Sequence, residues 1–200
     1  MWQPILYEVG REGSAWARDP ALVFTKKLRL TTTGKACLDL FIRLSSLMAN
    51  PTDTALSLFR ANYNCAQAVV FAFADELGIA RDTALRAACG FGGGIGHRQE
   101  TCGAVMGAII VLGLRHGRAL GEPKAKSDDT YARVQEFMHR FEARHGTCVC
   151  RDLLGGCDFN TEAGEREFKE RGYREARCAV FIRDAVRIVE ELERDLPVKG

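Results

Sequence analysis

The sequence predicts an all-α fold, a compact helical bundle of about five to six helices. Apolar residues recur at spacings of three and four through most of the chain after Pro51, which is the periodicity of helices with one buried face. Residues that cap helix N-termini precede these segments, and the alternation typical of strands is nearly absent. With 200 residues and a hydrophobic fraction of 46%, the chain is large and apolar enough for one packed core.

The first fifty residues lack this pattern. The stretches REGSAWARDP and RLTTTGKACL mix charged residues, glycine and threonine without a sustained period, and the pair Asn50-Pro51 is a helix-boundary signal. We therefore expect residues 1–50 to form a poorly ordered N-terminal extension and residues 51–196 to form the helical domain. Met48 lies just before this boundary, so a mis-assigned start is an alternative explanation for the extension.

Three helices are expected before the glycine-rich stretch GFGGGIG. Thr52 or Asp53 would cap the first helix, and Asn62 or Asn64 would cap the second, CAQAVVFAFADELG. Apolar residues nearly encircle this second segment, which predicts a central helix. Asp82 would cap the third, TALRAAC.

Further helices are expected after the glycine-rich stretch. Thr101 would cap CGAVMGAIIVLGLRHG, which ends in cations before a glycine, as helix C-termini often do. After a polar linker around Pro123, SDDTYARVQEFMHRFEARHG is predicted to be a long amphipathic helix, and REARCAVFIRDAVRIVEELERDL the last helix. Between these two, TCVCRDLLGG is expected to form a short turn or helix, and TEAGEREFKERG a weakly helical segment.

Charge and hydropathy argue against several classes of protein. The formal net charge is +2, so no nucleic-acid partner is expected. The best apolar run, residues 105–114, is about half as long as the ~18–20 residues of a membrane span, and no span is expected. The opening MWQPILYEVG has no basic region followed by an apolar stretch, so we expect a cytoplasmic protein.

The eight cysteines are the strongest functional signal. Their share of the chain is well below the ~8–10% of a disulfide scaffold. In the reducing cytosol, clustered cysteines more often bind metal or do redox work than form structural disulfides. The absence of any Cys-x-x-Cys pair argues against a thioredoxin-type motif and a zinc ribbon. Several of the eight are expected to be small buried hydrophobic residues, as free cysteines often are.

Four of the cysteines are predicted to lie at helix N-termini. Cys65 and Cys102 follow predicted capping residues, and Cys148 and Cys150 lie in the first turn of TCVCRDLLGG. Unpaired N–H groups and the positive end of the helix dipole favour the thiolate, which is the nucleophile and the metal ligand. Cys178 instead lies on the apolar face of the last helix, where it could reach the others or simply pack in the core.

The glycines between Gly90 and Gly96 do not spell a nucleotide-binding loop. They contain no G-x-G-x-x-G, no strand precedes them, and no Gly-Lys-Ser/Thr follows. Gly103 and Gly107 lie four residues apart on one helix face, so a cofactor or a second helix could approach closely, with plain helix contact favoured for Gly107. His97 is either an exposed loop residue or a ligand or proton shuttle.

The motifs Asn-Cys-Ala-Gln at 64–67 and Cys-Gly-Ala-Val-Met-Gly at 102–107, with the glycine-rich loop between them, resemble the C_GCAxxG_C_C family of redox-active proteins. The stretch FEARHGTCVCRDLLG and a cysteine near the C-terminus resemble its later elements, so the likeness covers roughly Thr54 to Leu192. The resemblance implies that the four characteristic cysteines are Cys65, Cys102, Cys150 and Cys178. It leaves as extras Cys37, Cys89, Cys148 and Cys157.

Three functions are compatible with the sequence. The favoured one is a redox-active protein whose clustered cysteines carry out thiol–disulfide exchange or electron transfer with a redox partner, as a thiol-dependent oxidoreductase would. In the second, the same four cysteines together form a metal-binding site for an iron–sulfur cluster or zinc. In the third, the chain is a non-catalytic helical structural domain. A homodimer is a further alternative that the sequence leaves open.

Overall fold

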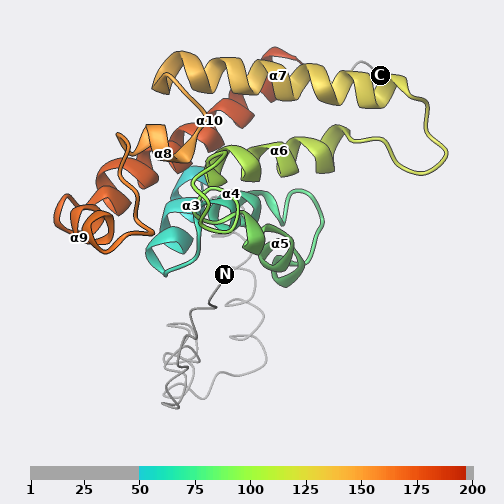
Figure 1. Cartoon of the computed structure of the whole chain (residues 1–200). Coiled ribbons are helices and arrows are strands. Elements are labelled where there is room, and N and C mark those ends of the chain that lie inside the picture. The colour runs from blue at the N-terminus through green and yellow to red at the C-terminus, as the bar shows by residue number, and fades with distance from the viewer. Residues whose placement is uncertain (1–49, 197–200) are drawn as a thin grey trace, which may run out of the picture. The chain divides into compact units, whose positions relative to one another are not determined.

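The computed structural model describes residues 50–196, and these residues confirm the all-α prediction (Figure 1). The predicted extension lies outside the described residues, except for Asn50. The described part contains eight α-helices, a 3-10 turn and a π-helical turn, and two of the α-helices are the short segments predicted to be weak. In chain order these elements are α3 (Pro51–Arg60), α4 (Cys65–Phe73), α5 (Arg81–Ala88), η2 (Cys89–Phe91), α6 (Gly103–His116), α7 (Ala125–His145), α8 (Cys150–Leu153), α9 (Glu162–Glu170), η3 (Arg174–Cys178) and α10 (Ala179–Asp195).

None of the described helices is both long enough and apolar enough to span a bilayer.

Helix α4 is the central helix, as its apolar surface predicted. It packs against α3, α5, α6 and α10. Its N-terminus carries a capping box, in which the Asn64 side chain accepts a hydrogen bond from the Gln67 amide (2.9 Å) and the Gln67 side chain accepts one from the Asn64 amide (3.1 Å). This reciprocal pair satisfies two N–H groups that no helical carbonyl can reach. Helix α4 therefore begins at Cys65.

The other helix starts differ from those predicted. Asn50, rather than Thr52 or Asp53, caps α3, and its side chain accepts a hydrogen bond from the Thr52 amide (2.8 Å). The helix begins at Pro51, because the first helical position does not need the N–H group that proline lacks. Helix α5 begins at Arg81 without any side-chain cap, so Asp82 is not the cap. Helix α6 has Cys102 at its N-cap, because Thr101 is drawn into a β-bridge.

Helices α4 and α6 approach each other closely along two glycines. A Cβ atom on Gly107 would lie 2.8 Å from the Cβ of Val69 and 2.9 Å from the carbonyl oxygen of Ala66. A Cβ atom on Gly103 would lie 2.9 Å from the carbonyl oxygen of Phe91. Such distances are shorter than packed side chains allow, so only glycine permits this spacing.

Helices α7 and α10 complete the core. In Figure 1, α7 runs along the top of the molecule next to α6, and α10 passes behind them. Phe137 and Phe141 of α7 are fully buried, as are Ile182 and Leu192 of α10. The apolar face predicted for the last helix is the face that it buries. Burial of these large side chains is the main source of stability in such a bundle.

We predict that Gly107→Ala destabilises the protein by about 1–3 kcal/mol, the usual cost of overpacking a filled core. The matched control is Gly113→Ala in the same helix, where nothing lies within 4 Å of the added Cβ. That change should stabilise by up to about 1 kcal/mol, because alanine is the better helix former. Chemical denaturation of both variants measures the difference, and a gain in stability for Gly107→Ala would contradict the close approach.

Candidate functional site

Cys65 and Cys178 are direct neighbours in the structure. Cys65 is the first residue of α4, and Cys178 is the last residue of the π-helical turn η3, which leads into α10. Their side chains are close enough for Cys178 to be the largest cause of the raised pKa of Cys65. Both residues are partly buried, and Cys178 contacts both the main core and a smaller apolar cluster around Leu154 and Tyr173. Two thiols from opposite ends of the domain's sequence thus meet near its surface.

Arg174 ties the turn η3 to the start of α4. Its guanidinium donates hydrogen bonds to the backbone carbonyls of Phe59 and Tyr63, and lies 4.0 Å from the centre of the Phe59 ring. The neighbouring Cys178, and then burial, raise the pKa of Cys65 well above its usual value, and the positive charge of Arg174 offsets only part of the rise. Arg174 lies 115 residues from Phe59 in the chain, so no sequence spacing indicated its place in the site.

A short backbone pairing brings together the two segments that carry the other predicted cysteines. Thr101 and Val149 form an antiparallel bridge. On one side of it, the Cys102 amide donates to the Cys148 carbonyl (2.8 Å), and on the other the Cys150 amide donates back across the bridge (2.6 Å). Cys148 was predicted in the first turn of a short helix, but that helix begins only at Cys150. No strand pattern marks these segments in the sequence, because the pairing is a single bridge.

At Cys102 and Cys150, burial opposes the effect by which a helix start favours the thiolate. Burial raises the pKa of Cys102 to about 12, and the neighbouring Cys65 adds to this, although the N–H groups of Ala104 and Val105 lower it. Burial, followed by the neighbouring Cys102 and Cys65, also raises the pKa of Cys150. The free-energy cost of removing a thiolate from water is therefore larger than the stabilisation that a helix N-terminus gives it. The same interactions place Cys65, Cys102 and Cys150 close to one another.

The glycine-rich loop curls against Cys150 in a left-handed turn. Residues 93–97 all have positive φ, from 58° to 71°, although Ile95 and His97 are not glycine. Gly94 (φ +71°) cannot carry a side chain, because its Cβ would lie 2.7 Å from the Cβ of Cys150. The loop therefore needs glycine both for its backbone conformation and for its contact with a candidate site residue.

The end of this loop is fastened to the segment that follows α8. The buried Gln99 side chain donates a hydrogen bond to the Cys157 carbonyl (2.7 Å), and the Asn160 side chain donates to the His97 carbonyl (2.8 Å). The Arg151 amide donates to the Gln99 carbonyl (3.1 Å). These hydrogen bonds therefore hold the glycine-rich loop against α8, the helix that begins with Cys150.

The remaining candidates lie apart from this cluster or have a local role. His97 is exposed on the glycine loop. Cys89 is exposed in η2, and the buried Cys157 thiol donates to the Gly164 carbonyl (3.3 Å). Cys37 lies outside the described residues.

Two observations concern the predicted metal ligands and the glycines predicted to bind a cofactor. Among residues 50–196, no three Cys, His, Asp or Glu side chains are placed to hold one ion together. The face formed by Gly103 and Gly107, for which both a cofactor and a second helix were considered, is covered by α4. The second of these alternatives therefore describes the two glycines.

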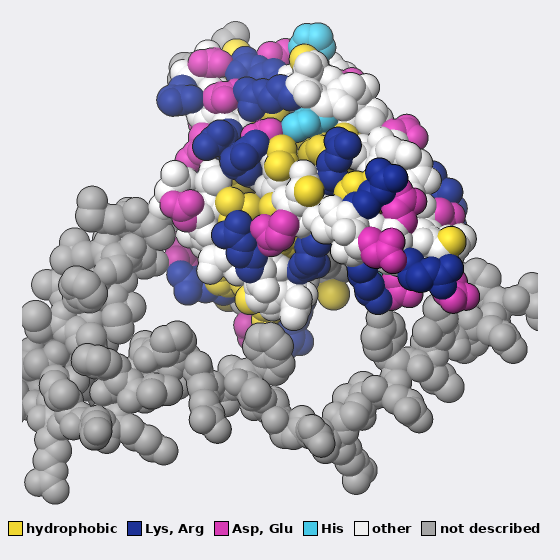
Figure 2. All heavy atoms as spheres, turned by 90° about the vertical axis from the view of Figure 1, so that its left-hand side faces the viewer, with side chains coloured by type: hydrophobic (Ala, Val, Ile, Leu, Met, Phe, Trp, Pro, Cys, Tyr) yellow, Lys and Arg dark blue, Asp and Glu magenta, His cyan; other side chains and the backbone are white. Residues whose placement is uncertain are grey.

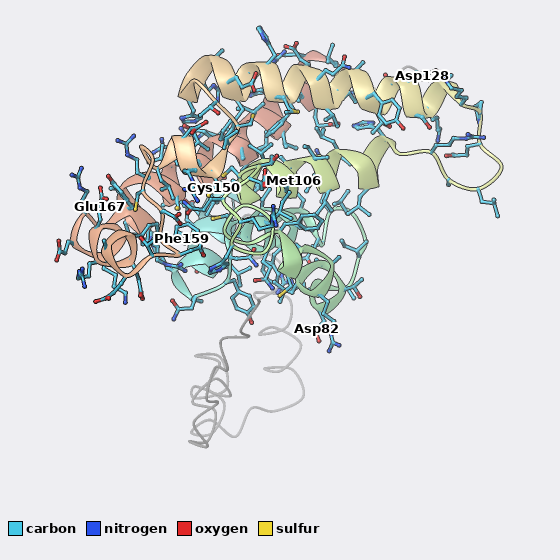
Figure 3. The ribbon with its side chains drawn as sticks, viewed as in Figure 1. Asp82, Met106, Asp128, Cys150, Phe159 and Glu167 are labelled. Atoms are coloured by element: carbon cyan, nitrogen blue, oxygen red, sulfur yellow. The ribbon has the colours of Figure 1, made fainter. Side chains whose placement is uncertain are left out.

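The surface near Cys150 carries charges of both signs. In Figure 3, Cys150 and Phe159 lie where α8 and the segment leading to α9 adjoin the glycine loop. Figure 2 shows the protein from this side, with Lys and Arg side chains interspersed among Asp and Glu and small hydrophobic areas between them. A partner that docks on this face would meet a mixed surface rather than a field of one sign.

Comparison with known families identifies the pattern. The family model described as "Putative redox-active protein (C_GCAxxG_C_C)" matches residues 63–192. The matched range contains Cys65, Cys102, Cys150 and Cys178 and leaves out the first sixty-two residues. No curated protein and no solved structure matches the chain.

We predict that the free energy of unfolding falls as the pH rises from about 9 to about 12. Cys102 in the unfolded chain ionises near its ordinary pKa of 9.0, whereas the folded protein keeps its proton to about 12, so within this window the unfolded state releases a proton that the folded state retains. Denaturation curves at several pH values measure the slope. Cys102→Ala is the control, because it cannot titrate and should give a shallower slope; equal slopes would contradict the raised pKa.

We also predict that Gly94→Ala destabilises the protein by more than 1 kcal/mol, because a left-handed non-glycine residue alone costs roughly 1–2 kcal/mol. The clash with Cys150 adds to this cost and should make the Cys150 thiol react faster with a maleimide. Gly90→Ala is the matched control from the same loop, since its added Cβ meets nothing within 4 Å. If both variants behaved like the natural protein, the loop would not pack on Cys150 as described.

Proposed function

This chain belongs to the C_GCAxxG_C_C family, and on that premise we propose that it is a thiol–disulfide redox protein whose working pair is Cys65 and Cys178. The observation that carries the proposal is the proximity of these two thiols, since Cys178 is the largest cause of the raised pKa of Cys65. Side chains in such contact can be joined by a disulfide with little backbone movement. Both residues are only partly buried, so an external disulfide can reach them.

The raised pKa of Cys65 also supports an assignment of roles. We assign Cys178 as the attacking sulfur and Cys65 as the resolving thiol, which keeps its proton until the second step. The positive charge of Arg174 beside Cys65 stabilises negative charge on the pair as the second sulfur attacks.

The reaction balances as a two-electron exchange. The Cys178 thiolate attacks one sulfur of a substrate disulfide, forms a mixed disulfide, and releases the other substrate sulfur as a thiolate. That thiolate takes the proton of Cys65, whose sulfur then attacks Cys178. The Cys65–Cys178 bond forms, the bond to the substrate breaks, and the second substrate sulfur leaves as a thiolate, which takes from water the proton that Cys178 released when it ionised. The pair loses two electrons, and the substrate disulfide becomes two thiols.

We predict that oxidised glutathione joins Cys65 to Cys178 in the full-length protein. Trypsin then yields peptide 61–81, which contains Cys65, linked to peptide 178–183, which begins with Cys178. Cys65→Ser should instead trap glutathione on Cys178, because no resolving thiol remains, whereas Cys178→Ser should give neither product. Cys89→Ser serves as the control and should behave like the natural protein, since Cys89 contacts Asn64 through its backbone carbonyl (2.9 Å), which serine keeps.

Two results would overturn this proposal. One is reduced thiols at both positions after complete equilibration with an oxidising glutathione buffer, in protein that is shown to be folded. The other is protein purified without oxygen that contains stoichiometric iron and sulfide, or zinc, which Cys65→Ser and Cys178→Ser release. The second result would favour a metal site over exchange.

A further inference from the structure

Cys148, which lies outside the four characteristic cysteines, faces Cys102 across the bridge. The Thr101–Val149 bridge is antiparallel, so the residues that follow Thr101 and precede Val149 are directly opposite each other. The hydrogen bond from the Cys102 amide to the Cys148 carbonyl (2.8 Å) fixes this register. Residues opposite each other at such a hydrogen-bonded position have Cα atoms about 5.5 Å apart, within the ~4.4–6.8 Å that a disulfide needs.

The same register makes Cys148 a better partner for Cys102 than Cys150. Opposite residues on an antiparallel pair have Cβ atoms about 4.5–5.5 Å apart, whereas diagonal neighbours are about 7–8 Å apart. Cys150 is diagonal to Cys102, and its own opposite residue is Glu100, whose carbonyl accepts the Cys150 amide. In addition, the Cβ of Cys150 packs against Gly94.

The surroundings of Cys148 suit a thiol that reacts with an internal partner. Cys102 and Cys148 are 4% and 6% exposed, so a bulky disulfide cannot reach either of them. Burial and then the nearby carboxylate of Glu142 raise the pKa of Cys148. On the other side, burial and then Cys65 raise the pKa of Cys102. Cys102 thus adjoins Cys65 through Gly103, where an added Cβ would lie 3.2 Å from the Cys65 Cβ, and adjoins Cys148 through the backbone hydrogen bond (2.8 Å).

We propose that Cys102 and Cys148 form a second, internal redox pair that passes electrons to the Cys65–Cys178 disulfide. The inference deepens the proposed function and rests on it, because the internal pair exchanges with the outer one. It gives this chain four redox electrons instead of two, and it assigns a role to a cysteine that the family pattern omits.

The internal step also balances. The Cys102 thiolate attacks the Cys65 sulfur, so that a Cys102–Cys65 bond forms and Cys178 leaves as a thiolate. The Cys148 thiolate then attacks Cys102, the Cys102–Cys148 bond forms, and Cys65 leaves. The two protons released by Cys102 and Cys148 pass to the two leaving thiolates. Two electrons move from the internal pair to the outer pair, and no other oxidant takes part.

Mass spectrometry of the full-length protein tests this proposal. The reduced protein is titrated with increasing ratios of oxidised to reduced dithiothreitol, free thiols are blocked, and trypsin is added. Cys102 lies on peptide 99–115, and Cys148 and Cys150 both lie on peptide 145–151. We expect these two peptides to become linked, and we expect fragmentation to place the bond on Cys148. The linked species should be kept in Cys150→Ser and lost in Cys148→Ser.

The same spectra separate the two proposals. A 61–81 to 178–183 link without any link to 99–115 overturns the internal pair and leaves the proposed function standing. The reverse result overturns the outer pair and leaves a Cys102–Cys148 disulfide of another kind. A link that fragmentation places on Cys150 overturns the assignment of Cys148, and because this is read from the natural protein, the result does not depend on whether either variant folds.

Discussion

The close approach of α4 and α6 is the constraint on which the candidate site depends. Gly103 and Gly107 bring the two helices together, and a Cβ on Gly103 would lie only 3.2 Å from the Cβ of Cys65. Gly103 directly follows Cys102, so the same glycine that admits α4 also sets Cys102 beside Cys65. In the motif Cys-Gly-Ala-x-x-Gly, the cysteine is therefore followed by two glycines, Gly103 and Gly107, which bring a second cysteine, Cys65, next to it.

Burial has a larger effect on the pKa of these thiols than their position at a helix start does. The N–H groups of Ala104 and Val105 lower the pKa of Cys102 at its helix start, yet that pKa is raised to about 12 because a buried thiolate would lose its water. A thiol that keeps its proton reacts slowly with solvent oxidants, since the thiolate is the reactive form. Such sulfurs are suited to exchange with a neighbour that is already in contact. The partly buried Cys65 and Cys178 remain the pair that an external disulfide can meet.

Sequence reasoning succeeded where the structure is set by local interactions. The all-α class, the central α4 and its Asn64 cap follow from periodicity and from side chains within one turn of the helix start. It failed where the local structure depends on contacts between segments that are distant in the chain. Thr101 caps nothing because Val149 pairs with it, and the contact between Cys65 and Cys178 depends on a π-helical turn that no local pattern indicates. The family resemblance selected the four cysteines, but it carried no information about Cys148.

The glycine-rich loop helps to set the register of the Thr101–Val149 bridge. Three non-glycine residues, Ile95, His97 and Gln99, adopt positive φ, at a cost of roughly 1–2 kcal/mol each. The buried Gln99 side chain and its carbonyl are held by the segment 151–157, which offsets that cost and fixes where the next residues pair. A slip of one residue in an antiparallel pair turns every side chain to the other face, and Cys102 would then point away from Cys148. The strain in the loop therefore lies directly beside the backbone pairing that sets which cysteines meet.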